Sequence, residues 1–500
     1  MNSNGVNRRG QGVPEEQMLL TERPINAANI VKPTPNGKLC EKQSFLTPEP
    51  VRLTPAWEAG NLPNDELNLK GITMEEAQLE CSQPKDRYNF VYLILLLHGI
   101  GTLLPWNMFI TAKSYFVEYK LSKNYTGVES DYAASFLTYH GFAAQGPNLL
   151  FNWLNIFIQI GGNLTTRIVW SIVVEMAAFL ITVIFAMTDS STWPGTFFWL
   201  TIILVIILNM ANGIYQNTVY GMAAKLPASY TGAIILGANI SGTFTSIISI
   251  GSVAIAPNPK TAAMYYFITA LLVLSLCFDT YFALPLNRFY KYNELKSQRE
   301  AQKRLKDNTR DPKSTPYWEI FVSCFPQCLN VFLTFFTTLA VFPAVHSDIK
   351  RSDPNFIVSE TYYVHIMCFL TFNLAAMIGS SLPAFGSWPK PKYLWIPITL
   401  RLLFIPLFLI CNYQPLGVER ILPVYIDNDW AFWIVGAAMG ITSGYFSSVA
   451  MMYCPGTVNK EYASIASMFG AACIITGICA GLATNMVMPW IVANLYLPAI

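Results

Sequence analysis

Polar side chains inside otherwise apolar stretches are the residues of this chain that could do chemistry. Residues 99–107 read Gly-Ile-Gly-Thr-Leu-Leu-Pro-Trp-Asn, so that Trp106 could stack on a flat ring and Asn107 offers an amide beside it. The two glycines permit close helix contact, and Pro105 frees a backbone carbonyl. This pattern favours a binding surface on a kinked helix. The alternative interpretation is a tryptophan that sits at the membrane interface.

Motifs for catalysis or metal binding are absent from the sequence, which has no HExxH, GxSxG or Walker A segment and only four scattered histidines. Most of the ten cysteines lie in or beside apolar stretches. The close pairs Cys324/Cys328 and Cys473/Cys479 lack CxxC spacing. We therefore expect packing cysteines, no metal, no cofactor and no enzymatic activity.

Three charged residues fall within apolar stretches: Glu175, Asp279 and Arg401. Their positions predict that all three lie about 10–12 Å from the cytoplasmic face of a membrane, at about 1.5 Å of rise per helical residue. An unpaired charge at that depth is costly. The three residues therefore suggest an ion-pair gate or a proton-coupling site, and the alternative is three separate charges that reach water.

The elements that must position these residues are membrane helices. Of the 500 residues, 53% are apolar and only 12% are charged, against about 25% charged in soluble proteins. This excludes a soluble enzyme, and a net charge of +2 gives no indication of a nucleic-acid partner. Hydropathy predicts eleven spans of about 20 residues, the length that crosses a bilayer as a helix: 89–112, 136–160, 168–187, 197–223, 231–254, 262–286, 318–344, 362–385, 393–411, 430–453 and 464–490.

Composition divides the chain into five parts. We predict a disordered cytoplasmic tail over residues 1–87, six helices over 88–286, a basic cytoplasmic linker over 287–317, five helices over 318–490 and a short extracytoplasmic tail over 491–500. Two helical halves on either side of a linker are typical of transporters with a substrate site between the halves.

The distribution of Lys and Arg predicts the orientation. The first 87 residues hold ten of them and residues 288–313 hold nine, whereas the alternate loops hold few. The positive-inside rule therefore places the amino terminus in the cytosol and, with eleven spans, the carboxyl terminus outside. Asn124-Tyr125-Thr126 is a glycosylation sequon in the first outside loop, which agrees with that orientation.

The amino-terminal tail contains a candidate sorting signal. Glu15 stands four positions before Leu19-Leu20, which resembles the acidic dileucine signals that clathrin adaptors bind. We expect a multi-pass protein of the plasma membrane, and this signal makes an endosomal or lysosomal membrane the alternative.

An ordered series of segments resembles the equilibrative nucleoside transporter family over about residues 84–490. The series begins with Lys85-Asp86-Arg87-Tyr88 and the Gly99–Asn107 segment. It continues with Gln216, Leu226-Pro227-Ala228-Ser229-Tyr230-Thr231, Leu284-Pro285, Phe289-Tyr290, Phe342-Pro343-Ala344-Val345, Phe369-Leu370-Thr371-Phe372-Asn373, Cys411-Asn412 and Ser443-Gly444-Tyr445. The resemblance implies an all-α, major-facilitator-like bundle of six plus five helices with a cytoplasmic amino terminus.

The resemblance also implies a substrate pocket, residue by residue. Trp106 and Asn107 match pocket positions of the first helix that stack on a nucleobase and bond its edge, and Gln216 matches a glutamine that bonds the base. An amide suits a base edge because it offers both a donor and an acceptor. The other matching positions are Ile110, Phe342 with the kink at Pro343, Phe369, Asn373 and Ile478.

One departure from the family pattern concerns the ribose. Where the family usually has an aspartate and an arginine that hold the ribose hydroxyls, this chain has Ala376 and Ser380. Losing both charges together is physically coherent, because losing one would strand the other in the membrane. Ser380, Ser381 or Thr371 would then have to bond the ribose, or the substrate differs.

These observations predict facilitative transport of nucleosides by alternating access. Two alternatives stay open at this point. An organic cation carrier would need a membrane carboxylate, for which Glu175 is the candidate. A nutrient sensor without transport would use its tail and linker to signal to partners.

Overall fold

The structure is a computed structural model. It describes residues 84–113, 115–127, 131–158, 162–255, 258–307, 315–415 and 418–496. The sorting signal predicted at Glu15, Leu19 and Leu20 and most of the predicted tail lie outside these residues, as does the end of the predicted 491–500 segment.

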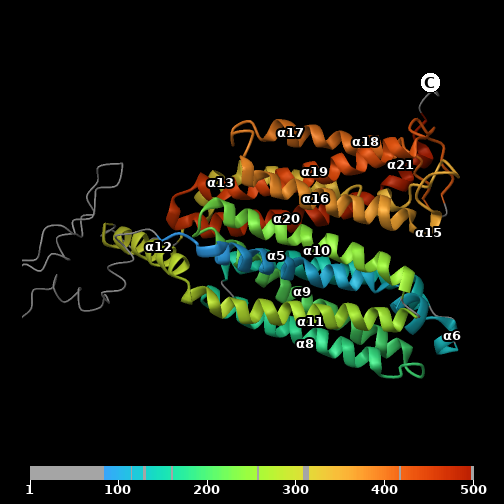
Figure 1. The fold of residues 1–500 in the computed structure, drawn as a ribbon, viewed down its shortest axis with the longest axis horizontal. Coiled ribbons are helices and arrows are strands. Elements are labelled where there is room, and N and C mark those ends of the chain that lie inside the picture. Colours follow the sequence, from blue (N-terminus) through green and yellow to red (C-terminus); the bar gives the residue numbers. More distant parts are fainter. Residues whose placement is uncertain are drawn as a thin grey trace, which may run out of the picture. The chain divides into compact units, whose positions relative to one another are not determined.

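The described residues of the first half form six long helices (Figure 1). They are α5 (Phe90–Thr111), α7 (Asp131–Phe157), α8 (Leu164–Met187), α9 (Pro194–Ala223), α10 (Ala228–Ile255) and α11 (Pro259–Ala283). The short α6 (Lys123–Thr126) lies between α5 and α7, and the basic α12 (Arg288–Asp307) follows α11. Polar residues set some boundaries: the Asn258 side chain accepts a hydrogen bond from the Thr261 N–H at 2.8 Å, which caps α11.

The second half contains three long helices and two broken ones. The long helices are α13 (Tyr317–Leu339), α19 (Asp429–Tyr453) and α20 (Ala463–Asn485). The predicted span 362–385 is a run of α15 (Glu360–Tyr363), the π-helical η7 (Val364–Leu370) and α16 (Thr371–Ser381). The predicted span 393–411 is α17 (Trp395–Leu400), the 3-10 turn η9 (Arg401–Leu403) and α18 (Phe404–Leu409). The shorter elements are α14 (Ala344–Ser347), η10 (Cys454–Thr457), η11 (Lys460–Tyr462) and α21 (Met488–Asn494).

Hydropathy supports a membrane protein. Within the described residues, nine helices are long and apolar enough to cross a bilayer. The run Trp395–Leu409 is apolar but shorter, and α7 carries buried Asn148, Asn152 and Asn155, which lower its hydropathy. The count of eleven spans and the predicted orientation stay predictions.

Glycines permit the closest helix contacts. A Cβ on Gly99 of α5 would overlap the carbonyl oxygen of Ile234 on α10, and a Cβ on Gly237 of α10 would overlap the carbonyl oxygen of Leu96 on α5. In the second half, Gly444 of α19 meets the Ala376 carbonyl of α16 in the same way. Small residues at such positions allow backbones to approach and pack by van der Waals contact.

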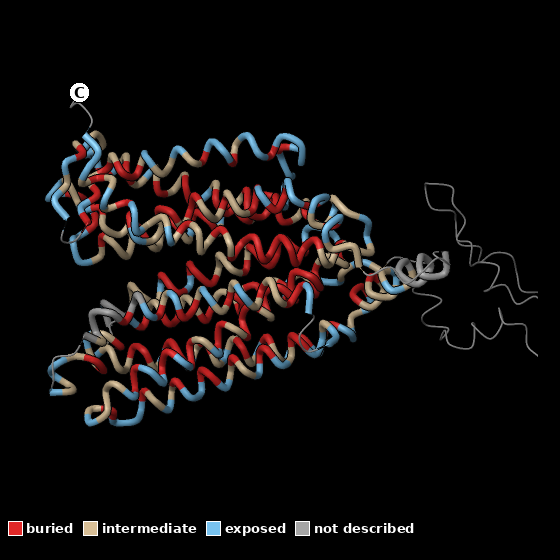
Figure 2. The backbone as a smooth tube through the Cα atoms, turned by 180° about the vertical axis from the view of Figure 1, so that it is seen from behind, coloured by how far each residue is buried: buried red, intermediate tan, exposed pale blue. Residues whose placement is uncertain are grey.

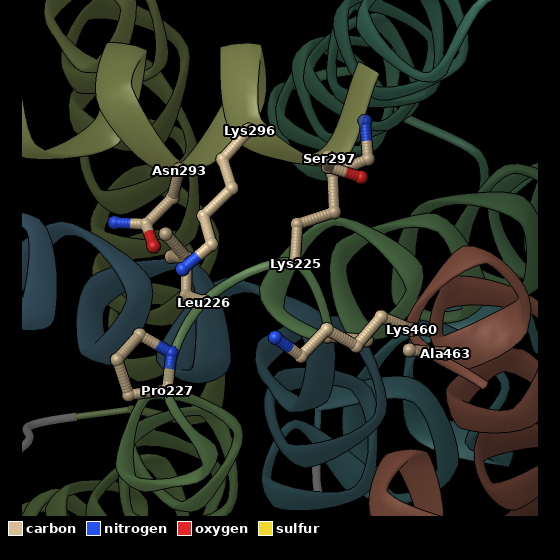
Figure 3. A pocket seen from close by; sticks show the side chains of 9 residues that line it. Lys225, Leu226, Pro227, Asn293, Lys296, Ser297, Lys460 and Ala463 are labelled. Carbon is tan, nitrogen blue, oxygen red and sulfur yellow. The ribbon is translucent and has the colours of Figure 1, made fainter. Parts of the chain in front are cut away.

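Burial follows the faces on which helices meet. Figure 2 shows buried backbone where helices face one another and exposed backbone along their outer sides. Many outer side chains are large and apolar, for example Phe142 (66% exposed), Trp170 (64%) and Ile434 (69%). Such exposure would be costly in water and suits a surface that faces lipid.

Candidate substrate site

The first-half wall of the predicted site comes from α5. The half-buried Trp106 ring stacks on His140 of α7, with ring centroids 5.8 Å apart and an interplanar angle of 20°. The Asn107 Nδ2 donates to the Ser241 Oγ of α10 at 3.2 Å. Ile110, one turn further along α5, is also half-buried. The indole therefore has one face held by an imidazole, and the neighbouring amide is oriented by α10.

Gln216 of α9 belongs to a connected set of buried amides. The Asn152 Nδ2 of α7 donates to the Gln216 Oε1 at 3.5 Å and to the Asn148 Oδ1 at 3.3 Å. The Asn217 Nδ2 donates to the Asn152 Oδ1 at 3.1 Å, and the Asn155 Nδ2 donates to the Asn217 Oδ1 at 3.0 Å. This amide chain fixes the Gln216 oxygen. The Gln216 NH2 remains as the group that can donate to a ligand.

Aromatic side chains form the second-half wall. Phe342 follows the end of α13, stacks on Phe372 with centroids 4.0 Å apart and meets Phe369 edge-on at 5.9 Å. On α16, the Asn373 Nδ2 donates to the Ser246 Oγ of α10 at 3.0 Å and to its own helix at the Phe369 carbonyl at 2.9 Å. Ile478 of α20 is half-buried.

Helix α10 joins the two walls. Its Ser241 accepts a hydrogen bond from Asn107 of the first half, and its Ser246 accepts one from Asn373 of the second half. The Ser249 Oγ of the same helix lies 3.3 Å from the His365 Nδ1 of η7. The structure therefore brings Asn107 and Asn373 to one shared helix. Among the described residues, no hydrogen bond or ring contact joins Trp106, Gln216 and Phe342 directly to one another.

The hydroxyls proposed for the ribose each donate a hydrogen bond within their own helical run, and the Thr371 Oγ1 also accepts one from the Trp433 Nε1 of α19 at 2.7 Å. The Ser380 Oγ donates to the Met377 carbonyl at 3.0 Å, the Ser381 Oγ to the Ile378 carbonyl at 2.7 Å and the Thr371 Oγ1 to the Ile366 carbonyl at 2.8 Å. Ser380 is only 5% exposed. Each hydroxyl oxygen keeps acceptor capacity, but its proton is engaged.

The three intramembrane charges are not brought together. Glu175 of α8 is fully buried in the first half, and neither carboxyl oxygen has a hydrogen-bond partner. Arg401 is buried in the second half and donates to the Thr334 carbonyl, Thr338 Oγ1 and Thr442 Oγ1 at 2.8–3.1 Å. Asp279 of α11 is exposed. The structure therefore does not form the hypothesised ion-pair gate, because the Glu175 carboxyl has no hydrogen-bond partner, Arg401 donates to oxygens of its own half, and Asp279 is exposed.

Comparison with known proteins gives the family. A family model described as "Nucleoside transporter" matches residues 202–489. The human equilibrative nucleoside transporter 1 is 32% identical over 445 residues, which are 80% of this chain and 96% of that protein. The chain belongs to the equilibrative nucleoside transporter family. Human equilibrative nucleoside transporter 2 is 27% identical (80% of this chain, 96% of that protein), and the rat equilibrative nucleoside transporter 3 is also 27% identical (82% and 93%).

Solved structures show the same fold at low identity. The human organic anion transporter MFSD10 superposes with a TM-score of 0.51 at 12% identity, over 81% of this chain and 95% of that chain. The major facilitator superfamily proton:xylose symporter XylE gives 0.50 at 11%, over 81% and 88%. The major-facilitator-like fold expected from the resemblance is therefore confirmed, as is the family itself.

Several polar residues of this family member were missed by sequence reasoning. They are His140 beneath Trp106, the Asn152 and Asn217 partners of Gln216, and the two serines of α10. One signal was available: Asn148, Asn152 and Asn155 repeat at helical spacing within a predicted span. The serines gave no such signal, since a lone serine in a membrane helix usually bonds its own backbone.

The predicted glycosylation sequon begins at Asn124. Asn124 is exposed on α6, between α5 and α7. Its modification stays a prediction.

Proposed function

We propose that this protein carries nucleosides across a membrane by facilitated, alternating-access transport. Membership of the equilibrative nucleoside transporter family over about 80% of the chain is the observation that carries the proposal. Equilibrative transport needs no coupling ion, so the substrate gradient alone sets the direction.

The site residues have distinct roles in this proposal. The Trp106 indole stacks on the nucleobase, and the free NH2 of Gln216 donates to an acceptor on the base edge. Asn107 and Asn373 bond the substrate from the two halves, each held by a serine of α10. Phe342, Phe369, Ile110 and Ile478 provide apolar walls.

Contacts between the halves suggest how access alternates. At the end of the bundle predicted to be cytoplasmic, the Asn217 Nδ2 of α9 donates to the Met468 carbonyl of α20 at 2.9 Å, and the Trp153 Nε1 of α7 donates to the Thr476 Oγ1 of α20 at 3.0 Å. These hydrogen bonds must break when that end opens. Asn217 also donates to Asn152, which in turn donates to Gln216. One chain of amides therefore connects the proposed base-binding residue Gln216 to a hydrogen bond that joins the two halves.

The test is uptake of radiolabelled uridine and adenosine in cells that express the protein, with mock-transfected cells as the control. Uptake above the mock level, and exchange of internal for external substrate in proteoliposomes, are expected. No uptake at any pH from 5.5 to 7.5 with normal surface expression would contradict the proposal. Exchange also separates a carrier from the alternative sensor, which would show none.

Gln216→Ala tests the base site. A buried neutral hydrogen bond is worth about 0.5–1.5 kcal/mol net, and stranding its partner costs about 1–3 kcal/mol. We expect a strong loss of purine nucleoside uptake. Unchanged kinetics at normal surface expression would remove Gln216 from the site.

We further propose that Glu175 binds a proton. A carboxyl group without a hydrogen-bond partner in a membrane interior is far cheaper to bury neutral than charged. Its surroundings contain other titratable groups. His98 of α5 lies with its Nδ1 2.7 Å from the Tyr215 Oη of α9, and both Tyr215 and Cys277 of α11 lie near Glu175. Asp279 and Arg401 are less suited to this role, because one is exposed and the other is fully hydrogen-bonded.

Glu175→Gln separates proton coupling from facilitated transport. If Glu175 exchanges a proton during transport, wild-type uptake changes between pH 5.5 and 7.5 and the Gln variant shows a flat profile. Identical profiles remove Glu175 from any coupling role and leave facilitated transport intact.

No observation favours the organic cation alternative. A cation carrier needs a carboxylate that faces its substrate, whereas Glu175 is fully buried within the first half and the family aspartate is replaced by Ala376. Competition by serotonin-like cations, with no competition by nucleosides, would reverse this choice.

The resident membrane is part of the proposal as well. We propose residence at the plasma membrane with Asn124 glycosylated outside, and a clathrin adaptor as the partner of Glu15, Leu19 and Leu20. Replacing Leu19-Leu20 by alanines should raise the surface fraction, and Asn124→Gln should remove a glycosidase-sensitive mass shift.

A further inference from the structure

Three cysteines that are distant in the sequence meet in the second half. Cys324 and Cys328 lie one turn apart on α13, and Cys454 is the first residue of the turn η10 that follows α19. All three sulfur atoms lie within 4.8 Å of one another. The side chains are buried, with 0%, 1% and 0% exposure. We call these residues the thiol cluster.

The spacing of the thiol cluster fits a tetrahedral metal ion. The Cys328 and Cys324 sulfur atoms are 3.7 Å apart. With metal–sulfur bonds of about 2.3 Å, two ligands on a tetrahedral zinc ion are about 3.8 Å apart. A disulfide would instead require about 2.05 Å. The Cys324 and Cys328 thiols are thus separated as metal ligands are, not as a disulfide is, and the Cys454 sulfur atom lies within 4.8 Å of both.

More sulfur surrounds the cluster. The Cys473 thiol of α20 lies near the Cys328 thiol, but it is not one of the three sulfur atoms that all lie within 4.8 Å of one another. Gly470 of α20 leaves room beside it: a Cβ there would lie 3.4 Å from the Cys454 sulfur and 2.8 Å from the Met451 sulfur. Four of the eight cysteines in the described residues therefore gather at one place.

Cysteines elsewhere in the same half provide the contrast. Cys368 and Cys411 are equally buried, but the thiol of each has only a backbone carbonyl as its hydrogen-bond partner, Pro343 at 3.9 Å and Leu407 at 3.3 Å. That is how a packing cysteine in a helix behaves. Cys324 and Cys454 also donate to backbone carbonyls, of Phe321 at 3.5 Å and of Ala466 at 3.2 Å. The thiol cluster differs because its members come from two elements, α13 and η10, and their sulfur atoms face one another.

We propose that the thiol cluster binds a Zn²⁺ ion. Each coordinating thiol loses its proton to water on binding. Three thiolates on Zn²⁺ leave one net negative charge in a dry site, whereas three on monovalent copper would leave two. The smaller charge favours zinc because burying charge is costly. The ion would join α13 to the turn that follows α19, at the end of the bundle predicted to be cytoplasmic, where thiols stay reduced.

Metal analysis of the purified full-length protein tests this site. We expect about one zinc per chain in the wild type. Added Co²⁺ should give the charge-transfer and d–d absorption of tetrahedral thiolate coordination. Cys324→Ser and Cys454→Ser should each reduce bound zinc to roughly a tenth or less, since structural zinc sites need all of their ligands. Cys368→Ser and Cys411→Ser are the matched controls and should retain zinc.

A second arm uses wild-type protein, so that a misfolded variant cannot obscure the answer. The protein is alkylated with N-ethylmaleimide after chelation and again after reloading with zinc, and the modified peptides are identified by mass spectrometry. Zinc should protect Cys324, Cys328 and Cys454 while leaving Cys368 unchanged. Zinc content equal to background, together with equal alkylation in both conditions, would overturn the proposal.

Discussion

At the residue scale, the buried amides of α7 and α9 decide what Gln216 can offer a ligand. Asn152 is fully buried and bonds Gln216, Asn148 and Asn217 at once. Because the Gln216 oxygen is already engaged, the orientation of its amide follows from Asn152. A buried polar network of this kind is favourable only while its members are satisfied.

Asn152→Ala should therefore weaken transport although, in this proposal, Asn152 is a positioning residue. We expect KM for adenosine to rise several-fold. The hydrogen bond that orients the Gln216 amide is worth roughly 1 kcal/mol, and this variant removes it. Asn209→Ala is the matched control, because the Asn209 amide is buried on α9 but donates only to the Val205 carbonyl of its own helix. Equal KM values for the two variants would exclude an orienting role.

At the element scale, the contact between α5 and α10 depends on two glycines that have no room for a side chain. Gly99 faces the Ile234 carbonyl, and Gly237 faces the Leu96 carbonyl. The same two helices carry Asn107 and its partner Ser241. The fit of backbone on backbone therefore sets the geometry of the substrate site.

Gly237→Ala should push α5 and α10 apart. Overpacking costs about 1–3 kcal/mol, so we expect a lower melting temperature and reduced uptake. Gly141→Ala on α7 is the control, because a Cβ there meets no atom within 4 Å, and alanine is favoured over glycine in helices by about 1 kcal/mol. A normal melting temperature for Gly237→Ala would contradict the close contact.

A polar clip joins two loops of the first half at the end that is predicted to be extracytoplasmic. The Tyr125 hydroxyl donates to the Asp189 Oδ1 at 2.8 Å and accepts from the Ser190 N–H at 3.1 Å. Hydrogen bonds from the Ser191 N–H and from Tyr125 lower the pKa of Asp189 to about 2. A carboxylate with a lowered pKa stabilises the fold above its unfolded pKa, and this contribution is lost only as pH falls through about 4 towards 2.

The clip should therefore survive the pH of an endosome or lysosome. Protease cleavage between α5 and α7 is expected to be equally slow at pH 5 and pH 7.5 in the wild type. Tyr125→Phe should speed cleavage at both pH values. Faster cleavage of the wild type at pH 5 would show that Asp189 is already protonated there.

At the scale of the whole molecule, polar contacts join the two halves at the end predicted to be cytoplasmic. The Trp153–Thr476 hydrogen bond is one of them. Since a net hydrogen bond is worth about 0.5–1.5 kcal/mol, removing it should move the equilibrium between closed and open states of this end by roughly 2- to 12-fold.

Thr476→Val keeps the shape of the side chain and removes the hydroxyl. We expect greater access of a charged thiol reagent to a cysteine introduced at this end. Thr484→Val on the same helix is the control, because the Thr484 hydroxyl donates to the Ala480 carbonyl within α20. Similar access in the two variants would show that the Trp153 contact does not hold this end closed.

The sequence by itself determined the helices and the family. The spans predicted at 89–112 and 168–187 correspond to α5 (Phe90–Thr111) and α8 (Leu164–Met187), and the basic segment after residue 287 begins α12. These features are local: a bilayer requires about 20 apolar residues with internally satisfied backbone bonds. The family motifs can also be recognised in the sequence alone, because each is a short contiguous segment.

Only the tertiary structure decided which side chains meet. Hydropathy does not specify the rotation of a helix about its axis or the identity of its neighbours. For this reason, Glu175 and Arg401 were candidate partners at one depth, whereas in the structure the Glu175 carboxyl has no hydrogen-bond partner and Arg401 donates to oxygens of its own half. For the same reason, the sequence spacing did not predict a metal site at Cys454, which lies 126 residues beyond Cys328. The two residues come together only because α13 and α19 pack side by side. A site assembled from separate helices has no spacing in sequence, so folding alone creates its geometry.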